Sequence, residues 1–173
     1  MNLVEEAIKN WESYRAGLIA ELENIPDSQM GYSPGDGGKT VREVAMHVAE
    51  TGVAFLAELM KPDGNYANFF KPEVQAALKA SMPTANSKAE LVALLKSTGA
   101  DFAAGLRAVG EPLAMQTMPT RAGTQSRLTA LNFSAAHEQY HRGQLAVYAR
   151  ALGAIPMLTQ QINAMLARQP LVS

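Results

Sequence analysis

Hydrophobic residues recur every three or four positions over the first part of the chain, which is the spacing of one face of an α-helix. The pattern predicts a helix over about residues 2–25, with Asn2 as its N-cap and Pro26 just after its end. Its apolar positions are Leu3, Ala7, Trp11, Tyr14, Leu18, Leu22 and Ile25. A single narrow stripe of this kind is typical of a helix packed in a bundle.

Similar patterns predict three more long helices and two short ones. The second and third long helices begin at capping boxes, in which Thr40 pairs with Glu43 and Ser87 pairs with Glu90. The long helices are expected over about residues 40–60, 87–109 and 126–152, and the short ones over about residues 72–81 and 156–167. The last helix is expected to bury an apolar face formed by Leu158, Ile162, Met165 and Leu166. Residues 115–118 carry a weak strand-like pattern.

These elements predict an all-α protein, a four-helix bundle that forms one domain over residues 1–173. Long connections join the second long helix to the third and the third to the fourth, and a short helix follows at the C-terminus. The connections leave two topologies open, a simple up-and-down bundle or a bundle with a crossover.

Composition excludes several classes of function. The formal net charge is −1, from 15 Lys and Arg against 16 Asp and Glu, so nothing attracts nucleic acid or an anionic membrane surface. No apolar run approaches the roughly 20 residues of a membrane-spanning helix, and the N-terminus lacks the pattern of a signal peptide. The absence of Cys excludes disulfides, thiolate nucleophiles and cysteine-ligated zinc. We therefore expect a cytoplasmic protein with no nucleic-acid or membrane partner.

The three histidines are the candidates for chemistry. His137 and His141 are four residues apart, so both imidazoles lie on one helical face, together with Leu145 and Tyr148. His47 lies in the middle of the second long helix, among apolar neighbours. Facing helices of a bundle project such side chains into a common core, where three imidazoles can bind one metal ion. The alternative is that each histidine is a hydrogen-bonded core residue.

Three histidine ligands leave at least one coordination position open, as in catalytic rather than structural metal sites. A divalent ion there would activate water or bind a thiol as thiolate. Zinc and nickel are the first candidates, and imidazole ligands also suit iron and manganese. The carboxylates nearest in sequence are Glu50 and Glu138, but we expect Glu138 to point outward, away from the His137 face. The sequence identifies no catalytic acid or base.

Residues 137–145 read His-Glu-Gln-Tyr-His-Arg-Gly-Gln-Leu, which resembles the His-x-x-x-His-Arg-Gly-Gln signature of the DinB-like superfamily of four-helix proteins. The distant His47 and the order of the helices over nearly the whole chain are similar to the same family. The resemblance implies a divalent metal bound through His47, His137 and His141. The resemblance also implies homodimers. Characterised members of the superfamily include S-transferases and isomerases that depend on low-molecular-weight bacterial thiols.

The residues and the resemblance together predict a metal-dependent enzyme of the DinB-like type. Its metal would activate water or a low-molecular-weight thiol for hydrolysis of, or transfer to, a small electrophile. We expect a homodimer and a small-molecule substrate. The alternative is a non-catalytic metal- or ligand-binding helical bundle, because no general base is evident beside the histidines.

Overall fold

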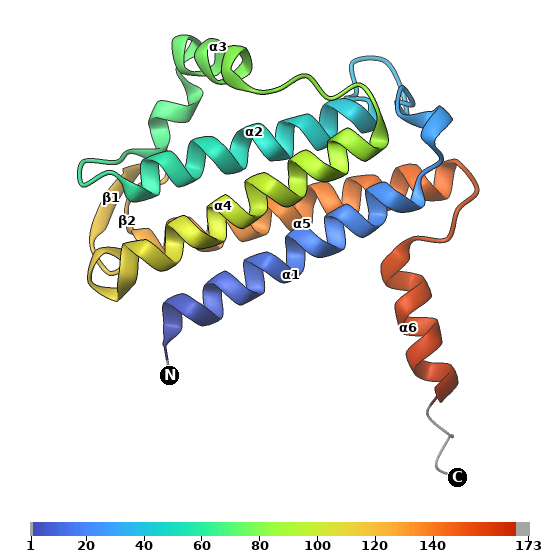
Figure 1. Cartoon of the computed structure of the whole chain (residues 1–173). Helices are drawn as coiled ribbons and strands as arrows, with labels where there is room; N and C mark the ends of the chain where they lie inside the picture. The colour runs from blue at the N-terminus through green and yellow to red at the C-terminus, as the bar shows by residue number, and fades with distance from the viewer. Residues whose placement is uncertain (1, 169–173) are drawn as a thin grey trace.

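The computed structural model describes residues 2–168, and its main feature is four long helices packed side by side (Figure 1). These are α1 (Leu3–Asn24), α2 (Val41–Met60), α4 (Lys88–Ala114) and α5 (Arg127–Ala151). The shorter elements are the 3₁₀ helices η1 (Asp27–Gln29) and η2 (Tyr66–Phe70), the helices α3 (Pro72–Ser81) and α6 (Met157–Arg168), and the strands β1 (Thr117–Thr120) and β2 (Gly123–Ser126). The predicted four-helix bundle is confirmed. Among residues 2–168, none of the helices combines the length and hydrophobicity that crossing a lipid bilayer requires.

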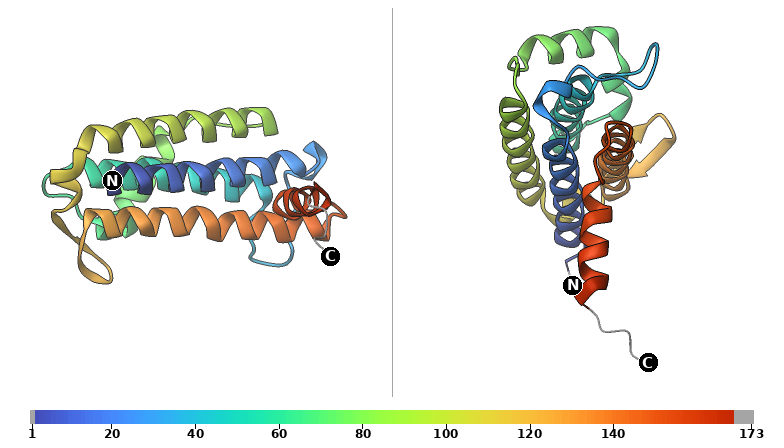
Figure 2. Two further views of the ribbon diagram at one scale, coloured as in Figure 1. Left: turned by 90° about the horizontal axis from the view of Figure 1, so that it is seen from below. Right: turned by 90° about the vertical axis from the view of Figure 1, so that its right-hand side faces the viewer.

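The bundle contains a crossover. Helices α1 and α2 each pack mainly against α4 and α5, so α1 and α2 lie diagonally across the bundle. Helices α2 and α4 run in the same direction, and α1 and α5 run in the opposite one (Figures 1 and 2). Between α2 and α4 the chain returns along the bundle through η2 and α3. Of the two topologies that the connections allowed, the structure has the one with a crossover.

The ends of the helices lie close to the positions predicted from capping residues and glycines. The side chains of Thr40 and Ser87 accept hydrogen bonds from the backbone N–H groups of Glu43 and Glu90, and both capping boxes are complete. The regular part of α4 ends at Gly110, where φ is 69° and an L side chain would be strained. The strand-like stretch is the first strand of an antiparallel hairpin, β1 with β2, slightly further along the chain than predicted.

The prediction of a buried face on the last helix is wrong. Its four apolar residues are 43–58% exposed, namely Leu158, Ile162, Met165 and Leu166. The reason is that α6 is attached to the bundle through its first turn. The buried carboxylate of Glu21 in α1 accepts hydrogen bonds from the backbone N–H groups of Met157 and Leu158, at 2.9 and 3.1 Å. A negative charge is favourable at a helix N-terminus, and the rest of α6 extends away from the bundle (Figure 1).

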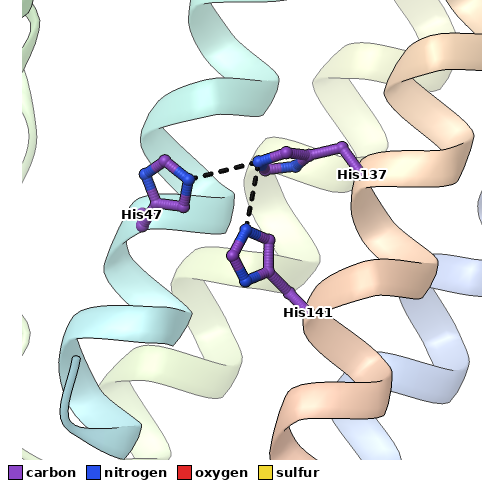
Figure 3. A group of neighbouring side chains, drawn as sticks. All are labelled: His47, His137 and His141. Carbon is purple, nitrogen blue, oxygen red and sulfur yellow. Dashed lines mark hydrogen bonds between the residues drawn. The ribbon is translucent and has the colours of Figure 1, made fainter. Parts of the chain in front are cut away.

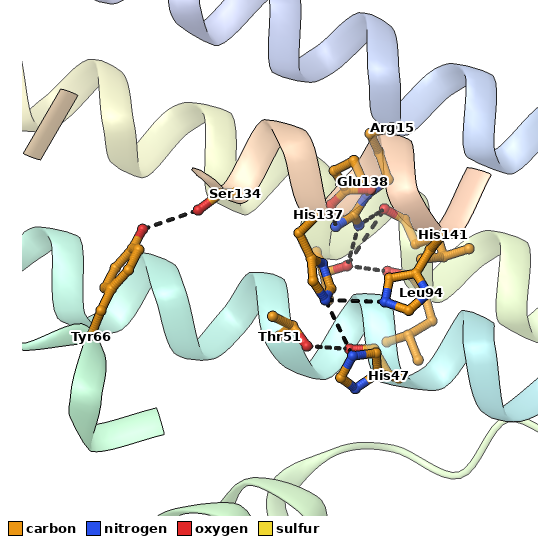
Figure 4. A network of polar contacts seen from close by, with 11 residues as sticks. Arg15, His47, Thr51, Tyr66, Leu94, Ser134, His137, Glu138 and His141 are labelled. Atoms are coloured by element: carbon orange, nitrogen blue, oxygen red, sulfur yellow. Dashed lines mark hydrogen bonds and ion pairs between the residues drawn. The ribbon is translucent and has the colours of Figure 1, made fainter. Parts of the chain in front are cut away.

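The apolar core falls into two clusters. One contains Leu22 and Leu95, and the other contains Trp11 and Phe102, which stack with their ring centroids 4.1 Å apart. Between the clusters lie polar side chains from all four long helices, which we call the polar layer: Arg15, His47, Thr51, Thr98, His137, Glu138 and His141 (Figure 4). The polar layer positions the candidate site in the middle of the bundle.

Candidate metal site

The structure brings the three histidines together between α2 and α5. His137 and His141 project from successive turns of α5 toward α2, and His47 projects from α2 toward them (Figure 3). The Nε2 atom of His137 lies 3.2 Å from Nε2 of His47 and 3.1 Å from Nε2 of His141. One ring nitrogen of each histidine lies within 4.8 Å of the other two. The predicted residues therefore share one small volume.

A chain of hydrogen bonds fixes the tautomer of His141. The hydroxyl of Tyr148 donates its one proton to the carbonyl oxygen of Lys39 at 2.9 Å, so it accepts from Nε2 of Gln144 at 2.7 Å. This turns Oε1 of Gln144 toward Nδ1 of His141, 2.9 Å away, and an amide oxygen can only accept. Nδ1 of His141 therefore carries the proton, and its Nε2 presents a lone pair to the other two rings.

The three rings have too few protons to hydrogen-bond one another fully. A neutral imidazole has one N–H, and that of His141 is used by Gln144. The Nε2 of His137 contacts both neighbours, so a single proton there would have to serve two contacts. A cation shared by three lone pairs resolves this shortage, because each nitrogen then acts as a donor of electrons to the same ion.

Burial keeps the histidines neutral. Together with repulsion from His141, it lowers the pKa of His137 to about 3 and that of His47 to about 4. Burial also lowers the pKa of His141, against the hydrogen bond to Gln144, which raises it. At neutral pH the rings therefore hold free lone pairs, which is the form that binds metal.

The spacing of the nitrogens matches a metal site. Zinc binds imidazole nitrogen at about 2.0–2.1 Å, so two ligands of a tetrahedral site lie about 3.3–3.4 Å apart. The distances from Nε2 of His137 to the other two Nε2 atoms, 3.1 and 3.2 Å, are close to this value. Three protein ligands leave a tetrahedral ion with one further position, which is the arrangement of catalytic sites.

Glu138 belongs to a different part of the polar layer. It points away from the His137 face as expected, but it points into the core and is 2% exposed, so the prediction that it faces outward is wrong. Its carboxylate accepts from Nε and Nη2 of Arg15 in α1 at 2.9 and 2.5 Å (Figure 4). Nη1 of Arg15 also donates to the carbonyl oxygen of Leu95 and to Oγ1 of Thr98. The cause is that α5 packs against both α1 and α2, and Glu138 lies on the face toward α1.

Glu50 does not contact the histidines. Burial raises the pKa of this carboxyl, yet within residues 2–168 it makes no hydrogen bond to the three rings. Arg15 was not identified from the sequence, because nothing in the amphipathic pattern of α1 distinguishes it from the other polar residues of that helix. Sequence reasoning considered Gln144 for a contact with a neighbouring helix or subunit and missed its contact with His141, although a spacing of three residues places both on one face.

Comparison with known proteins agrees with the fold. Residues 10–145 match the family model described as the DinB superfamily. No curated protein sequence gives a significant match. Two Bacillus subtilis structures are similar: a DinB-like protein, at 20% identity and a TM-score of 0.65 over 86% of this chain and 92% of that one, and YfiT, described as a probable metal-dependent hydrolase with an unusual four-helix bundle topology.

The match to YfiT has 18% identity and a TM-score of 0.66, over 87% of this chain and 88% of that one. A mycothiol-dependent maleylpyruvate isomerase is also similar, at 20% identity and a TM-score of 0.66. That alignment covers 82% of this chain but 60% of the isomerase. At such identities the likeness establishes the shared fold, and the chemistry has to be argued from the site.

Proposed function

Since the chain belongs to the DinB superfamily, we propose that it is a metal-dependent enzyme in which His47, His137 and His141 hold one divalent ion. The reaction would be hydrolysis of a small electrophile, or transfer of a low-molecular-weight thiol to it. The observation that carries the proposal is the convergence of three neutral imidazoles whose Nε2 atoms lack enough protons to satisfy one another. Zinc and nickel fit this ligand set first, and iron and manganese are also compatible.

The residues of the site have two roles, binding the metal ion and orienting the ligands that bind it. Nε2 of each histidine would bind the ion, and Gln144 keeps the Nε2 of His141 unprotonated by accepting from its Nδ1. Tyr148 orients Gln144 and ties it to the loop at Lys39. When bound, the ion would lower the pKa of a water or thiol in its open position and so supply a nucleophile at neutral pH.

The descriptions of the similar structures support this reaction class. YfiT is described as a probable metal-dependent hydrolase, and the isomerase depends on mycothiol. A metal ion can generate the nucleophile for either reaction, a hydroxide for hydrolysis or a thiolate for thiol transfer.

A second candidate is a non-catalytic metal-binding protein. It is favoured by the surroundings of the histidines, since Glu138 is paired with Arg15 and no carboxylate within residues 2–168 hydrogen-bonds the three rings. The two candidates differ in whether the ion has a position open to small molecules.

Cobalt substitution tests this difference. Cobalt(II) bound in place of the native ion has an absorption spectrum that depends on its ligands, so a small thiol such as 2-mercaptoethanol would add a sulfur-to-cobalt charge-transfer band. We expect a saturable new band, absent from His137→Ala. A spectrum unaffected by thiol and by azide would indicate a closed site and would favour the non-catalytic protein. An open site justifies screening esters and thiol acceptors for turnover.

We also propose a homodimer. The exposed apolar face of α6 is one surface that a second copy can cover, because its residues are hydrophobic and half exposed. Light scattering after gel filtration should give twice the mass of the chain, and Ile162→Glu should reduce it. An unchanged dimer in Ile162→Glu would place the interface elsewhere, and a monomeric wild-type protein would contradict the dimer.

A further inference from the structure

A small cavity lies at one end of the bundle, beside the histidines. It has a volume of about 150 Å³ and is enclosed by α2, η2, the turn between β1 and β2, and α5. Four aromatic residues form much of its wall: Phe55, Tyr66, Phe70 and Phe133. Arg121 and Gln125 of the hairpin are also at its edge.

The cavity and the histidine cluster share a wall. The ring of Phe55 has its centroid 6.0 Å from that of His137 and 5.8 Å from that of Phe133. Phe133 precedes His137 by four residues, so the two side chains lie one helical turn apart on the same face of α5. A molecule with one group in the cavity therefore reaches the cluster by extending across Phe133.

The cavity wall is apolar and well packed. Phe55 stacks on Tyr66 with centroids 4.6 Å apart and meets Phe69 edge-on at 5.2 Å. The hydroxyl of Tyr66, the one polar group of these rings, is 3.0 Å from Oγ of Ser134 in a buried hydrogen bond (Figure 4). A cavity of this size with apolar walls has room for a benzene-sized molecule.

The rim of the cavity combines exposed aromatic surface with a positive charge. Phe70 and Phe133 are 48% and 52% exposed. The guanidinium of Arg121 lies over the ring of Phe70, 4.7 Å from its centroid, and forms no ion pair within the described residues 2–168. A ligand that covers the rings and carries a negative charge would satisfy both features.

We propose that this cavity binds the aryl or short branched alkyl group of the substrate, and that Arg121 favours a substrate with a carboxylate over one with an amine. The inference rests on the proposed function only in calling the ligand the substrate. The reacting group of such a molecule lies beside the histidines, and the cavity determines which side groups are accepted.

Binding of three probes of similar shape tests the proposal on the purified protein. They are benzyl alcohol, phenylacetate and benzylammonium, titrated by NMR with the amides of residues 125 and 133 as reporters. We expect saturable binding of benzyl alcohol, and tighter binding of phenylacetate than of benzylammonium. Phe133→Ala should weaken benzyl alcohol roughly fivefold, since it removes an aromatic contact. Arg121→Gln should reduce the preference for the anion by about threefold.

The matched control is Val147→Ala, which truncates another exposed apolar residue of α5 that does not line the cavity. It should bind all three probes as the wild-type protein does. No saturable binding, or equal binding by Phe133→Ala and Val147→Ala, overturns the proposal. The probes do not require a metal, so binding without an open cobalt site supports the cavity and contradicts the enzyme. An open cobalt site without probe binding overturns the cavity alone.

Discussion

Two adjacent residues of α5, His137 and Glu138, face different neighbouring helices and belong to very different surroundings. Glu138 faces α1, where its carboxylate accepts from the guanidinium of Arg15, and that guanidinium also donates to groups of α4. His137 faces α2, where its Nε2 meets two other ring nitrogens with too few protons to share. The first group is complete within the protein, and the proposed cation would complete the second. The difference separates a structural polar group from a functional one.

The largest effect is expected from breaking the complete group. Arg15→Met leaves the carboxylate of Glu138 buried without its partner, so the free energy of unfolding should fall by about 3–5 kcal/mol. Urea denaturation followed by circular dichroism measures this change.

The matched control is the double variant Arg15→Met/Glu138→Leu. Replacing both members of a buried ion pair by apolar residues is often neutral, so the double variant should be clearly more stable than Arg15→Met. A loss of under about 1 kcal/mol in Arg15→Met would contradict a structural role for the pair.

The three histidines should instead make the free energy of unfolding depend on metal. Zinc at 100 times its dissociation constant should raise the free energy of unfolding by about 2.7 kcal/mol, because it binds the folded state. His47→Ala and His141→Ala should lose this gain. The gain is measured by urea denaturation with zinc and with a chelator. A gain retained in His141→Ala would remove that residue from the site.

Gln144→Leu tests the orientation of the ligands separately from their presence, because it leaves all three histidines in place. Without the acceptor for Nδ1, His141 can place its proton on Nε2, so metal affinity should fall about 10- to 100-fold. Competition with a chromophoric chelator measures the affinity. Gln139→Leu is the matched control on the same helix, and equal affinities for the two variants would disprove the orienting role of Gln144.

The smallest effect is expected at Thr98, which supports the ion pair from α4. Thr98→Val removes a hydroxyl that accepts from Arg15 at 3.2 Å, and should cost about 1 kcal/mol of stability. Metal affinity should not change. A loss of metal affinity in this variant would mean that the two parts of the polar layer are coupled.

The histidine group and the Glu138 pair also differ in how much of each could be predicted from the sequence. The helices and their capped starts follow from local patterns, and His47, His137 and His141 could be chosen because a spacing of four and a mid-helix position are local facts. The partner of Glu138 is 123 residues away in the sequence, so no spacing rule reveals it.

Two further features depend on tertiary packing. The apolar stripe of α6 predicts a covered face, but the pattern does not say whether this chain or another covers it. The crossover follows from the path of residues 61–87 along the bundle, and their irregular pattern carries no direction. Gln144, in contrast, could have been identified from its spacing to His141.

The most direct test is the metal content of the protein, measured by elemental mass spectrometry on protein purified without a histidine tag. We expect about one divalent ion per chain, and its loss in a folded His137→Ala variant. A wild-type protein that holds no metal after incubation with zinc, nickel and manganese would contradict this expectation, and would leave the three histidines as residues of the core.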